Sequence, residues 1–500
     1  MNRIANLLLF SAYLLIGPAV MAQPLGPLGD VNYGEVGSGK SEVGNRKWEV
    51  GSGKSEIGSG KSEVGNSFRM SVEQAGSDFR LSISNLSDEG LLDRVQQQTF
   101  NYFWKGGEPI SGAAPERIHE DGIYPHADAD VVTSGGTGFG IMSTIVAIDR
   151  GFITREEGRK RLRHLAEWLR EADRFHGAWP HWMYPSGKVK PFSRYDNGGD
   201  LVETAFLVQG MIVARQYFRN GNRKDRQLAA LLDQLWKEVD WQWYTRGENV
   251  LYWHWSPEHE WRMNFAVRGY NECTIMYILG ASSPTHPIDP ACFHEGYMRR
   301  GDIVSNENAY GYDVVLDHNG KGAIPVGPLF WAHYSFMGLN PRGLHDSYAD
   351  YWRLNRNHAL IHHAYCSDNP REYKGYSEAC WGLTASYSLT GYNAHHPSND
   401  LGVISPTAAL SSFPYTPDES RLFLRHLYKD HEEFIGEYGP YDAFSVESDW
   451  YLPRYLAIDQ LPIPVMIENY RSGLIWGLFM SAPEIQEGLQ KLGIQRSQNQ

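Results

Sequence analysis

The fold is decided by the stretch from Gly198 to Met211, GGDLVETAFLVQGM, which is typical of a loop that leads into an apolar helix. Asp200 stands where it can cap that helix. The apolar residues that follow share one helical face: Leu201, Ala205, Val208 and Ile212. Glu203 falls in the first turn, where a carboxyl group among apolar neighbours is costly unless it is paired or protonated. It is either a general acid or a structural carboxylate that the helix dipole stabilises.

Composition points to a neutral ligand with apolar faces. The 500 residues are 42% hydrophobic and 13% aromatic, and they include 16 Trp and 29 Tyr. This aromatic surplus suggests stacking surfaces for a ligand such as a sugar ring. The formal net charge of -13 argues against nucleic acid and against insertion into an anionic membrane surface. It argues equally against a polyuronate substrate, so a neutral glycan remains.

The first 77 residues differ from the rest of the chain. Residues 7–21 are apolar and are followed by small side chains at signal-peptidase offsets, so we interpret 1–22 as a signal peptide and expect export to the periplasm or the medium. Residues 23–77 repeat the motif GSGKSEVG and have few large apolar side chains, which predicts a disordered spacer. The Walker A match at 34–41 lacks the strand and helix it would need. The remaining residues, 78–500, form the predicted folded domain.

Helical patterns dominate this domain, and no alternation of strands and helices indicates a parallel sheet. Thr154 and Glu157 have the spacing of a capping box. Further helical stretches are predicted near 200–219, 226–240, 266–281, 325–338, 346–365, 378–388, 405–413 and 463–480. Short hairpins are predicted around 178–190 and 249–256. We therefore expect an all-α protein, an (α/α)6 toroid in which one large domain has six inner and six outer helices, with functional loops gathered at one end.

Several carboxylates lie at junctions between loops and helices. Besides Glu203, these are Asp130, Glu272 and Glu447, while Glu468 and Arg471 have the spacing of an ion pair within one helix. Neither a serine-nucleophile motif nor zinc or calcium ligand spacing occurs, so we expect no metal and no cofactor. Paired carboxylates among aromatic loops suit glycoside hydrolysis.

The four cysteines leave disulfide bonding open. Cys273 lies in an apolar helical run and is expected to be a buried thiol, and Cys366 with Cys380 is the first pair to test.

Seven motifs in this order resemble glycoside hydrolase family 144, the glycoamylase-like domain, over residues 88–490. They are DVVTSGGTGFG at 130–140, VET at 202–204, GYNE at 269–272, ASSPTHP at 281–287, CWGLTA at 380–385, SPTAAL at 405–410 and IENYR at 467–471. The resemblance implies an (α/α)6 toroid that hydrolyses β-1,2-glucan or its oligosaccharides with inversion. Family members either cut the chain internally or release sophorose from the non-reducing end.

The resemblance also assigns roles. It implies that Glu203 is the general acid and Asp130 the base or water-positioning residue, with Glu272 and Glu447 as alternates. The substrate-pocket residues that it implies are Trp182, Trp255, Tyr270, His333 and Arg471. We expect a monomer whose partner is a β-1,2-linked glucose oligo- or polysaccharide.

Three alternatives remain open at this point. The chain could be a non-catalytic glycan-binding protein on the same scaffold, since fold does not fix function. It could be a polysaccharide lyase, although such enzymes usually line the cleft with Arg and Lys, or a hydrolase of another glucan linkage. The sequence does not decide between internal and terminal cleavage.

Overall fold

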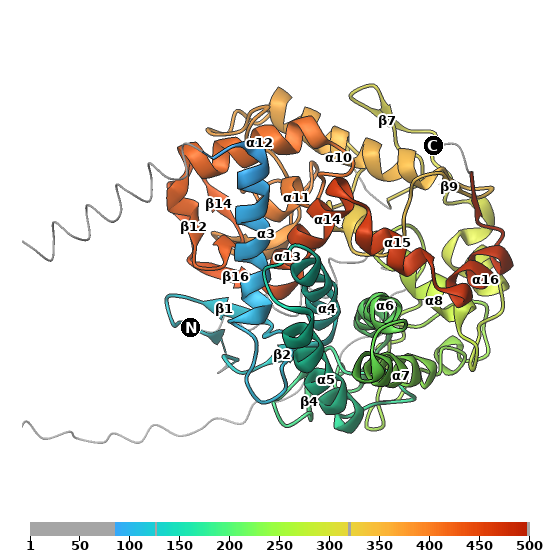
Figure 1. Cartoon of the computed structure of the whole chain (residues 1–500). Coiled ribbons are helices and arrows are strands. Elements are labelled where there is room, and N and C mark those ends of the chain that lie inside the picture. Colours follow the sequence, from blue (N-terminus) through green and yellow to red (C-terminus); the bar gives the residue numbers. More distant parts are fainter. Residues whose placement is uncertain (1–85, 126–127, 319–321, 498–500) are drawn as a thin grey trace, which may run out of the picture. The chain divides into compact units, whose positions relative to one another are not determined.

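Two helices lie side by side at the centre of the fold in the computed structural model, which describes residues 86–125, 128–318 and 322–497. They are α4 (Ser134–Asp149) and α6 (Leu201–Phe218), seen in Figure 1. Every residue of α6 except Tyr217 is buried. Helices that are buried all round are apolar all round, which explains why these segments lack a polar face.

Glycine lets these two helices touch backbone to backbone. A Cβ on Gly138 would lie 2.2 Å from the carbonyl oxygen of Phe206, and one on Gly210 would lie 2.2 Å from the carbonyl oxygen of Gly138. Real Cβ atoms do not approach backbone so closely, so any side chain at either position would push the helices apart.

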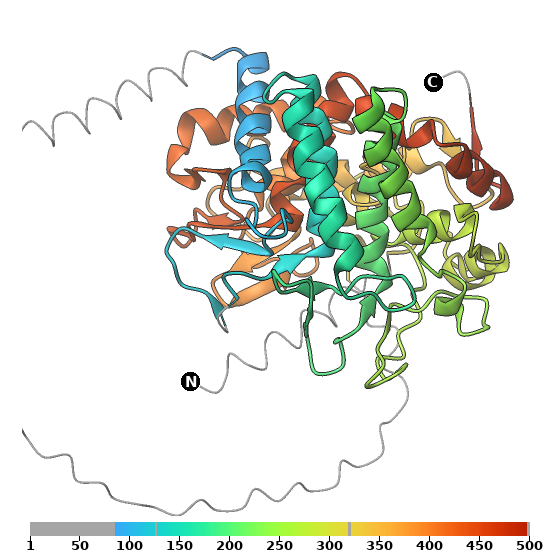
Figure 2. The same cartoon turned by 60° about the horizontal axis from the view of Figure 1, so that its bottom comes forward.

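Around this pair, helices that are buried on nearly all sides alternate along the chain with helices that bury only one face. The one-sided, outer elements are α3 (Asp88–Trp104), α5 (Arg155–Glu171), α7 (Arg223–Lys237), the π-helical turn Cys292–Tyr297, α10 (Tyr351–Asp368) and α12 (Pro417–Asp430). The inner ones are α4, α6, α8 (Thr274–Ser282), α9 (Phe330–His333), α11 (Pro406–Leu410) and α14 (Pro462–Arg471). Figures 1 and 2 show the teal pair α4 and α5 beside the green pair α6 and α7. The predicted (α/α)6 toroid is confirmed.

The remaining helices are short. They are α13 (Ala457–Gln460), α15 (Leu474–Met480), α16 (Pro483–Lys491) and the 3-10 turns Trp243–Thr245, Arg299–Gly301 and Glu432–Phe434. The predicted helix 463–480 is thus two helices, because the chain turns at Gly473, whose φ is +70°. No helix of the described residues has the length and apolar character needed to cross a membrane.

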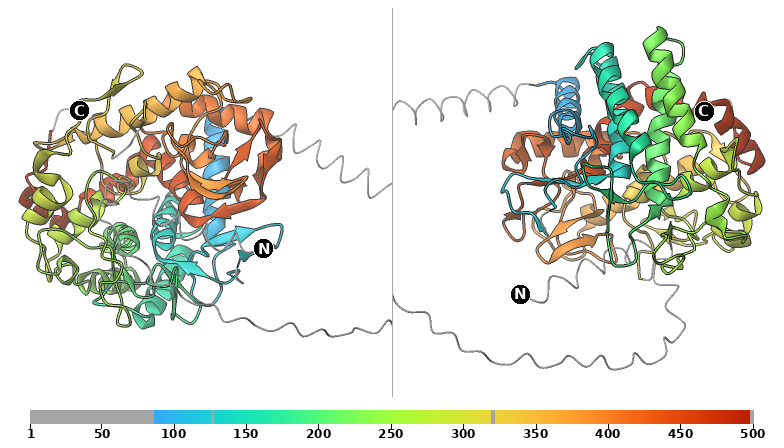
Figure 3. Two further views of the ribbon diagram at one scale, coloured as in Figure 1. Left: turned by 180° about the vertical axis from the view of Figure 1, so that it is seen from behind. Right: turned by 90° about the horizontal axis from the view of Figure 1, so that it is seen from below.

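Short antiparallel strands join the helices, and four sets of them shape the site. They are β1 (Arg117–His119) with β16 (Arg454–Leu456), β2 (Val132–Thr133) with β3 (Trp182–Met183) and β4 (Val189–Lys190), β5 (Gly199–Asp200) with β6 (His254–Trp255), and β10 (Ala385–Ser388) with β11 (Gly391–Ala394). In β1 and β16, Ile118 faces Tyr455 across 337 positions of sequence, so the beginning and the end of the domain meet there (Figure 3, left).

The other strands lie apart from the site. They are β7 (Asn308–Ala309) with β8 (Tyr312–Asp313), β9 (Leu344–His345) with β17 (Gln495–Arg496), β12 (Ile435–Gly436) with β13 (Gly439–Pro440), and β14 (Phe444–Ser445) with β15 (Trp450–Tyr451).

Some of the predictions of local structure are confirmed and one is wrong. The capping box of Thr154 and Glu157 is present, and the hairpin expected around 178–190 is β3 with β4. The predicted helix at 378–388 is wrong, because its second half is β10, which pairs with β11 across a turn at Leu389 and Thr390. The signal peptide 1–22, the spacer 23–77 and the domain start at 78 lie outside the described residues.

Two pairings expected from spacing are also corrected. Glu468 does not pair with Arg471: it accepts from the Arg150 guanidinium at 2.6 and 2.8 Å. All four cysteines are free and buried, so Cys366 and Cys380 form no disulfide. Helical packing therefore gives Glu468 a partner that the chain spacing does not suggest.

Candidate active site

A cavity of about 590 Å³ opens where the short strands meet the N-terminal turn of α6. Its walls come from the β1–β16 pair, the loop around β3, the start of α6, and the β10–β11 hairpin. Three glutamates line it: Glu116, Glu203 and Glu272. These segments are far apart in sequence, so the cavity exists only in the folded domain.

Glu203 is held in the first turn of α6. Asp200 caps the helix, and its Oδ1 accepts the backbone N–H groups of Val202 and Glu203, both at 2.9 Å. The Oε2 atom of Glu203 accepts the N–H of Gly135 at 2.8 Å. Burial raises the pKa of Glu203 to about 7. The His181 cation opposes this rise, whereas the negative charges of Asp200 and Glu116 add to it. A large part of this carboxyl group is therefore protonated at neutral pH, as a general acid requires.

His181 is a cation that contacts Asp200, the residue that caps α6. Its Nδ1 lies 3.1 Å from Oδ2 of Asp200, and that oxygen also accepts the indole N–H of Trp253 at 2.7 Å. Burial alone would lower the pKa of His181, but the charges of Glu203, Asp200 and Asp196 outweigh it and raise the pKa to about 10. The ring is thus an imidazolium at neutral pH, clamped by Asp200 beside the cavity.

The other two glutamates of the cavity, Glu116 and Glu272, have neighbouring charges of opposite sign. Burial raises the pKa of Glu116, but the cations Arg117 and His181 oppose that rise, and Arg117 Nη2 lies 3.7 Å from Glu116 Oε1. Burial raises the pKa of Glu272 to about 8, and the charges of Glu203 and Asp200 push it in the same direction. Glu116 is thus the cavity carboxylate with cationic support, and Glu272 is neutral at pH 7.

The cavity wall is largely aromatic. Trp182 on β3 is 6% exposed, and the Arg117 guanidinium lies 5.3 Å from the centre of its ring. Phe192 stacks on His181 at 4.3 Å, and Tyr387 and Tyr392 reach the cavity from β10 and β11. Flat rings around a few carboxyl groups are the usual construction of a sugar-binding site.

The structure places only part of the predicted catalytic set here. Glu203 and its alternate Glu272 share the cavity. Asp130 does not line it: the side chain is exposed in the loop before β2. Glu447 is exposed as well and accepts the backbone N–H of Lys374 at 2.9 Å. The structure thus places both residues outside the cavity lining, and their catalytic roles stay predictions, because closeness in a motif does not determine which way a loop residue turns.

Of the five predicted pocket residues, Trp182 lines the cavity. Tyr270 and His333 are buried between helices instead, where they bond Asn355 at 3.0 Å and Ser412 at 2.9 Å. Arg471 and Trp255 also lie outside the cavity lining. Arg471 binds Asp93 and Glu89 of α3, and Trp255 lies on β6. An aromatic or basic residue in a helical motif has the same sequence pattern whether it packs in the core or contacts a ligand.

Two residues of the cavity, Glu116 and His181, were not predicted from the sequence. Glu116 belongs to none of the seven motifs, and nothing near it in the sequence signals a cavity. His181 could have been found, because it stands in the aromatic stretch Trp179-Pro180-His181-Trp182. Its charge, however, depends on Asp200 and Glu203, which only the fold brings near.

One group of described residues has the spacing of metal ligands: His181, Asp196 and Asp200, whose ligand atoms lie within 4.8 Å of one another. Within this group His181 Nδ1 lies 3.1 Å from Asp200 Oδ2, and Asp196 Oδ1 lies 3.3 Å from His254 Nε2. We therefore describe the group as an ion-pair cluster and assign no metal to it.

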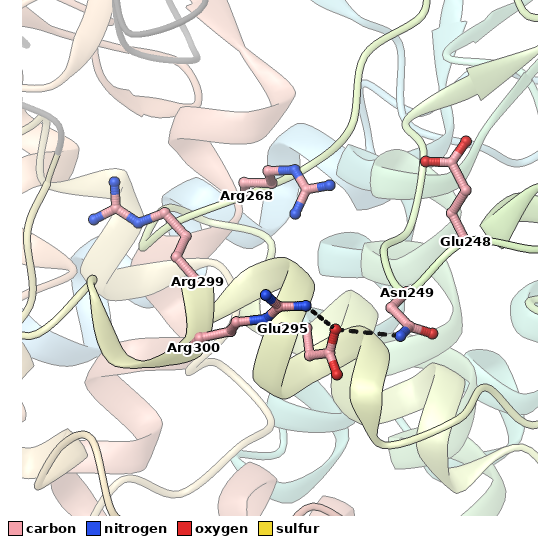
Figure 4. Close-up of a pocket in the computed structure, with 6 residues that line it drawn as sticks. All are labelled: Glu248, Asn249, Arg268, Glu295, Arg299 and Arg300. Atoms are coloured by element: carbon pink, nitrogen blue, oxygen red, sulfur yellow. Dashed lines mark hydrogen bonds and ion pairs between the residues drawn. The ribbon is translucent and has the colours of Figure 1, made fainter.

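A second cavity, of about 350 Å³, lies elsewhere and is strongly charged (Figure 4). Figure 4 shows Glu295 bridging Arg300, at 2.7 Å, and Asn249, at 3.4 Å. None of the predicted site residues lines this cavity. This second cavity has side chains of both charges, but it lacks buried carboxyl groups like those of the first cavity. The first cavity therefore remains the candidate active site.

Known proteins resemble the chain in sequence and in structure. Residues 264–483 match the glycoamylase family model. The structure of an endo-β-1,2-glucanase from Chitinophaga pinensis, in a sophorotriose and glucose complex, is 58% identical, with a TM-score of 0.81 over 82% of this chain and 99% of that chain. The chain belongs to glycoside hydrolase family 144.

Other members of the family are similar over the same region. A β-1,2-glucanase structure from Parabacteroides distasonis is 41% identical, with a TM-score of 0.77 over 82% of this chain and 60% of that chain. An exo β-1,2-glucooligosaccharide sophorohydrolase (non-reducing end) from the same species is 43% identical over 431 residues. The match covers 81% of this chain and 58% of that relative, so the chain spans little more than half the relative's length.

Proposed function

We propose that this family 144 member hydrolyses β-1,2-glucan, and that it does so in the cavity that Glu203 lines. The observation that carries the proposal is a buried carboxyl group with a pKa of about 7 in an aromatic-walled cavity. The relatives named as endo-β-1,2-glucanase and sophorohydrolase support the choice of linkage.

Glu203 acts as the general acid in this proposal. Its Oε2 is occupied by the N–H of Gly135, so Oε1 is the oxygen that carries the proton. That proton passes to the glycosidic oxygen as the bond to the anomeric carbon breaks, so that the departing sugar leaves as a neutral alcohol.

Glu116 takes the place that the sequence assigned to Asp130. Burial raises its pKa, and the cations Arg117 and His181 oppose that rise by favouring the ionised form, in which it can accept a proton from water. The water oxygen attacks the anomeric carbon from the face opposite the departing oxygen, and one displacement inverts the configuration. The proton gained by Glu116 and the proton lost by Glu203 balance over one turnover.

Glu272 and the rings position the sugar. Because Glu272 is neutral at pH 7 and its Oε2 has no hydrogen-bond partner among the described residues, it can donate to a sugar hydroxyl. Trp182 and Tyr387 offer flat faces to the pyranose ring.

Internal cleavage is the mode we favour, because the endo-acting relative is 58% identical and is matched over 99% of its chain. The test is chromatography of the products from long β-1,2-glucan at early times. A ladder of oligosaccharides supports the proposal. Sophorose alone from the start would make the enzyme exo-acting, and the absence of any new reducing ends would leave a glycan-binding protein.

Export and a monomeric state are also proposals. The apolar run at 7–21 and the small residues before 23 support cleavage after Ala22. N-terminal sequencing of the mature protein tests this, and light scattering tests the monomer. A start at Met1 or a dimer mass would contradict them.

A further inference from the structure

A cluster of aromatic side chains lies at the surface outside the cavity. We name it the tryptophan platform and define it as His176, Trp243, Trp255 and Trp261. His176 stacks on Trp243 with ring centres 3.7 Å apart and an interplanar angle of 11°, and Trp255 meets both rings edge-on at 4.8 and 5.9 Å. Trp261 lies 6.2 Å from Trp243. Trp243 is 39% exposed, which is unusual for the largest apolar side chain.

The platform is held together by strained backbone. His176, Arg246, Glu260 and Asn264 all have positive φ, between +45° and +56°. Each belongs to a loop that carries a platform ring, and His176 is itself the residue stacked on Trp243. A non-glycine residue in this region costs roughly 1 kcal/mol or more, and such strain gathers at functional sites.

Arg246 connects two of these strained positions. Its guanidinium donates to Asn264 Oδ1 at 2.7 Å and lies over the rings of Tyr252, at 4.5 Å, and Trp261, at 5.4 Å. The rings are thus fixed before any ligand arrives. A rigid aromatic surface loses little conformational entropy on binding.

Two segments of the chain join the platform to the cavity wall. β6 carries Trp255 and pairs with β5, whose Asp200 lines the cavity. The loop that presents Phe192 to the cavity continues to Tyr195, which packs edge-on against His259 at 5.2 Å, two residues before Trp261. The β5–β6 pair and the segment 192–195 thus join the cavity wall to the loops that carry the platform.

Charge around the platform favours a neutral ligand. The loops that carry the platform contain charges of both signs, with Arg246 near Glu248 and Arg262 near Glu258 and Glu260 in the sequence. The Arg262 guanidinium lies over Tyr195 at 5.4 Å. Indole faces bind the apolar faces of pyranose rings without any ionic contact. A neutral glucan fits this surface better than an acidic polymer does.

We propose that the tryptophan platform binds the part of a β-1,2-glucan chain that extends beyond the cavity. The platform is therefore a distal glucan-binding site that makes long chains better substrates than short ones. This inference rests on the proposed hydrolysis of β-1,2-glucan.

The experiment compares Trp243→Ala with the wild type on long β-1,2-glucan and on a short β-1,2-glucooligosaccharide. Loss of one ring stack should raise KM for the long chain about three- to tenfold. Turnover of the short substrate should change less than twofold, and Trp243→Phe should keep most of the long-chain preference. Tyr310→Ala is the matched control, because Tyr310 is 38% exposed on the β7–β8 hairpin.

The ratio of kcat/KM for long and short substrates is the deciding quantity, because a misfolded fraction lowers both values equally. An unchanged ratio in Trp243→Ala, with the wild type active, would overturn the platform alone. A wild type inactive on both substrates would overturn the proposed function instead. Binding of long glucan to Glu203→Gln in calorimetry, weakened three- to tenfold by adding Trp243→Ala, supports the platform independently.

Discussion

At the residue scale, the chemistry depends on one proton on one oxygen of Glu203. The N–H of Gly135 occupies Oε2 and the cap made by Asp200 fixes the backbone, so Oε1 is left to carry the proton. This arrangement separates the structural and the chemical tasks of the carboxyl group between its two oxygens.

Replacing Glu203 by Gln should remove catalysis and keep the fold. The amide oxygen can still accept the N–H of Gly135, but it has no acidic proton, so kcat on β-1,2-glucan should fall about 10³-fold. Reducing-sugar assays measure the loss. The matched control is Glu447→Gln, an exposed carboxylate outside the cavity, which should stay within twofold of the wild type. Activity of Glu203→Gln within tenfold of wild type, or a larger loss in Glu272→Gln, would remove Glu203 from the acid role.

The pKa of Glu203 predicts the pH dependence. Because the acid must be protonated and burial raises its pKa to about 7, kcat/KM should fall about tenfold per unit of pH above that value. Its pKa in the folded state lies above the ordinary 4.5, so ionisation opposes folding, and stability is lost as pH rises from about 4.5 to about 7. Glu203→Gln should therefore unfold at a higher temperature than wild type at pH 8 and at a similar one at pH 4. A rate that stays flat to pH 9 would contradict this assignment.

At the element scale, the contact between α4 and α6 aligns the acid. Gly135 in the first turn of α4 faces Glu203, and a Cβ there would lie 2.3 Å from Oε2. The two helices approach so closely because Gly138 and Gly210 meet backbone to backbone. Packing between helices therefore sets the position of the catalytic oxygen.

Gly135→Ala should impair activity more than stability. The new methyl group displaces the carboxyl group of Glu203 and weakens its bond to the Gly135 N–H, so kcat should fall at least about a hundredfold, as misplacement of a catalytic group does. Activity and thermal unfolding measure the two effects. Gly477→Ala on α15 is the control, because its Cβ would meet nothing within 4 Å and should stabilise the helix by about 0.5–1 kcal/mol. Equal activity of the two variants would show that Gly135 does not position the acid.

Helix ends were predicted correctly where interactions within one short segment determine them. The cap at Asp200 and the capping box at Thr154 are readable because a side chain bonds its own helix end. The predicted helix at 378–388 failed because β10 is stabilised by β11 across a turn, which is a contact outside the window of a helical pattern.

At the scale of the whole molecule, the proposed machinery lies between Glu116 and Ile458. The Chitinophaga structure matches 82% of this chain over 99% of its own length. The strand β1 near the start of the domain pairs with β16 near its end, which makes folding of the domain depend on both.

Removing residues 1–85 should leave hydrolysis intact. All cavity-lining residues lie from Glu116 onward, so kcat/KM should stay within twofold of the full chain. A shorter chain starting at Lys105 is the control: it lacks α3, which buries Leu91, Val95 and Phe103 against its neighbours, and it should be insoluble or unfolded. Loss of activity in a folded chain lacking 1–85 would show that the N-terminal segment takes part in the reaction.

Sequence alone determined the toroid, the family and the position of Glu203, because helix periodicity, caps and motifs are encoded in neighbouring residues. Tertiary structure decided which carboxyl groups share the cavity with Glu203: Glu116 and Glu272 do, and Asp130 does not. It also decided the charge of His181, which depends on carboxylates around a buried ring. Burial and charge proximity arise between segments that are distant in the chain, so no local pattern carries them.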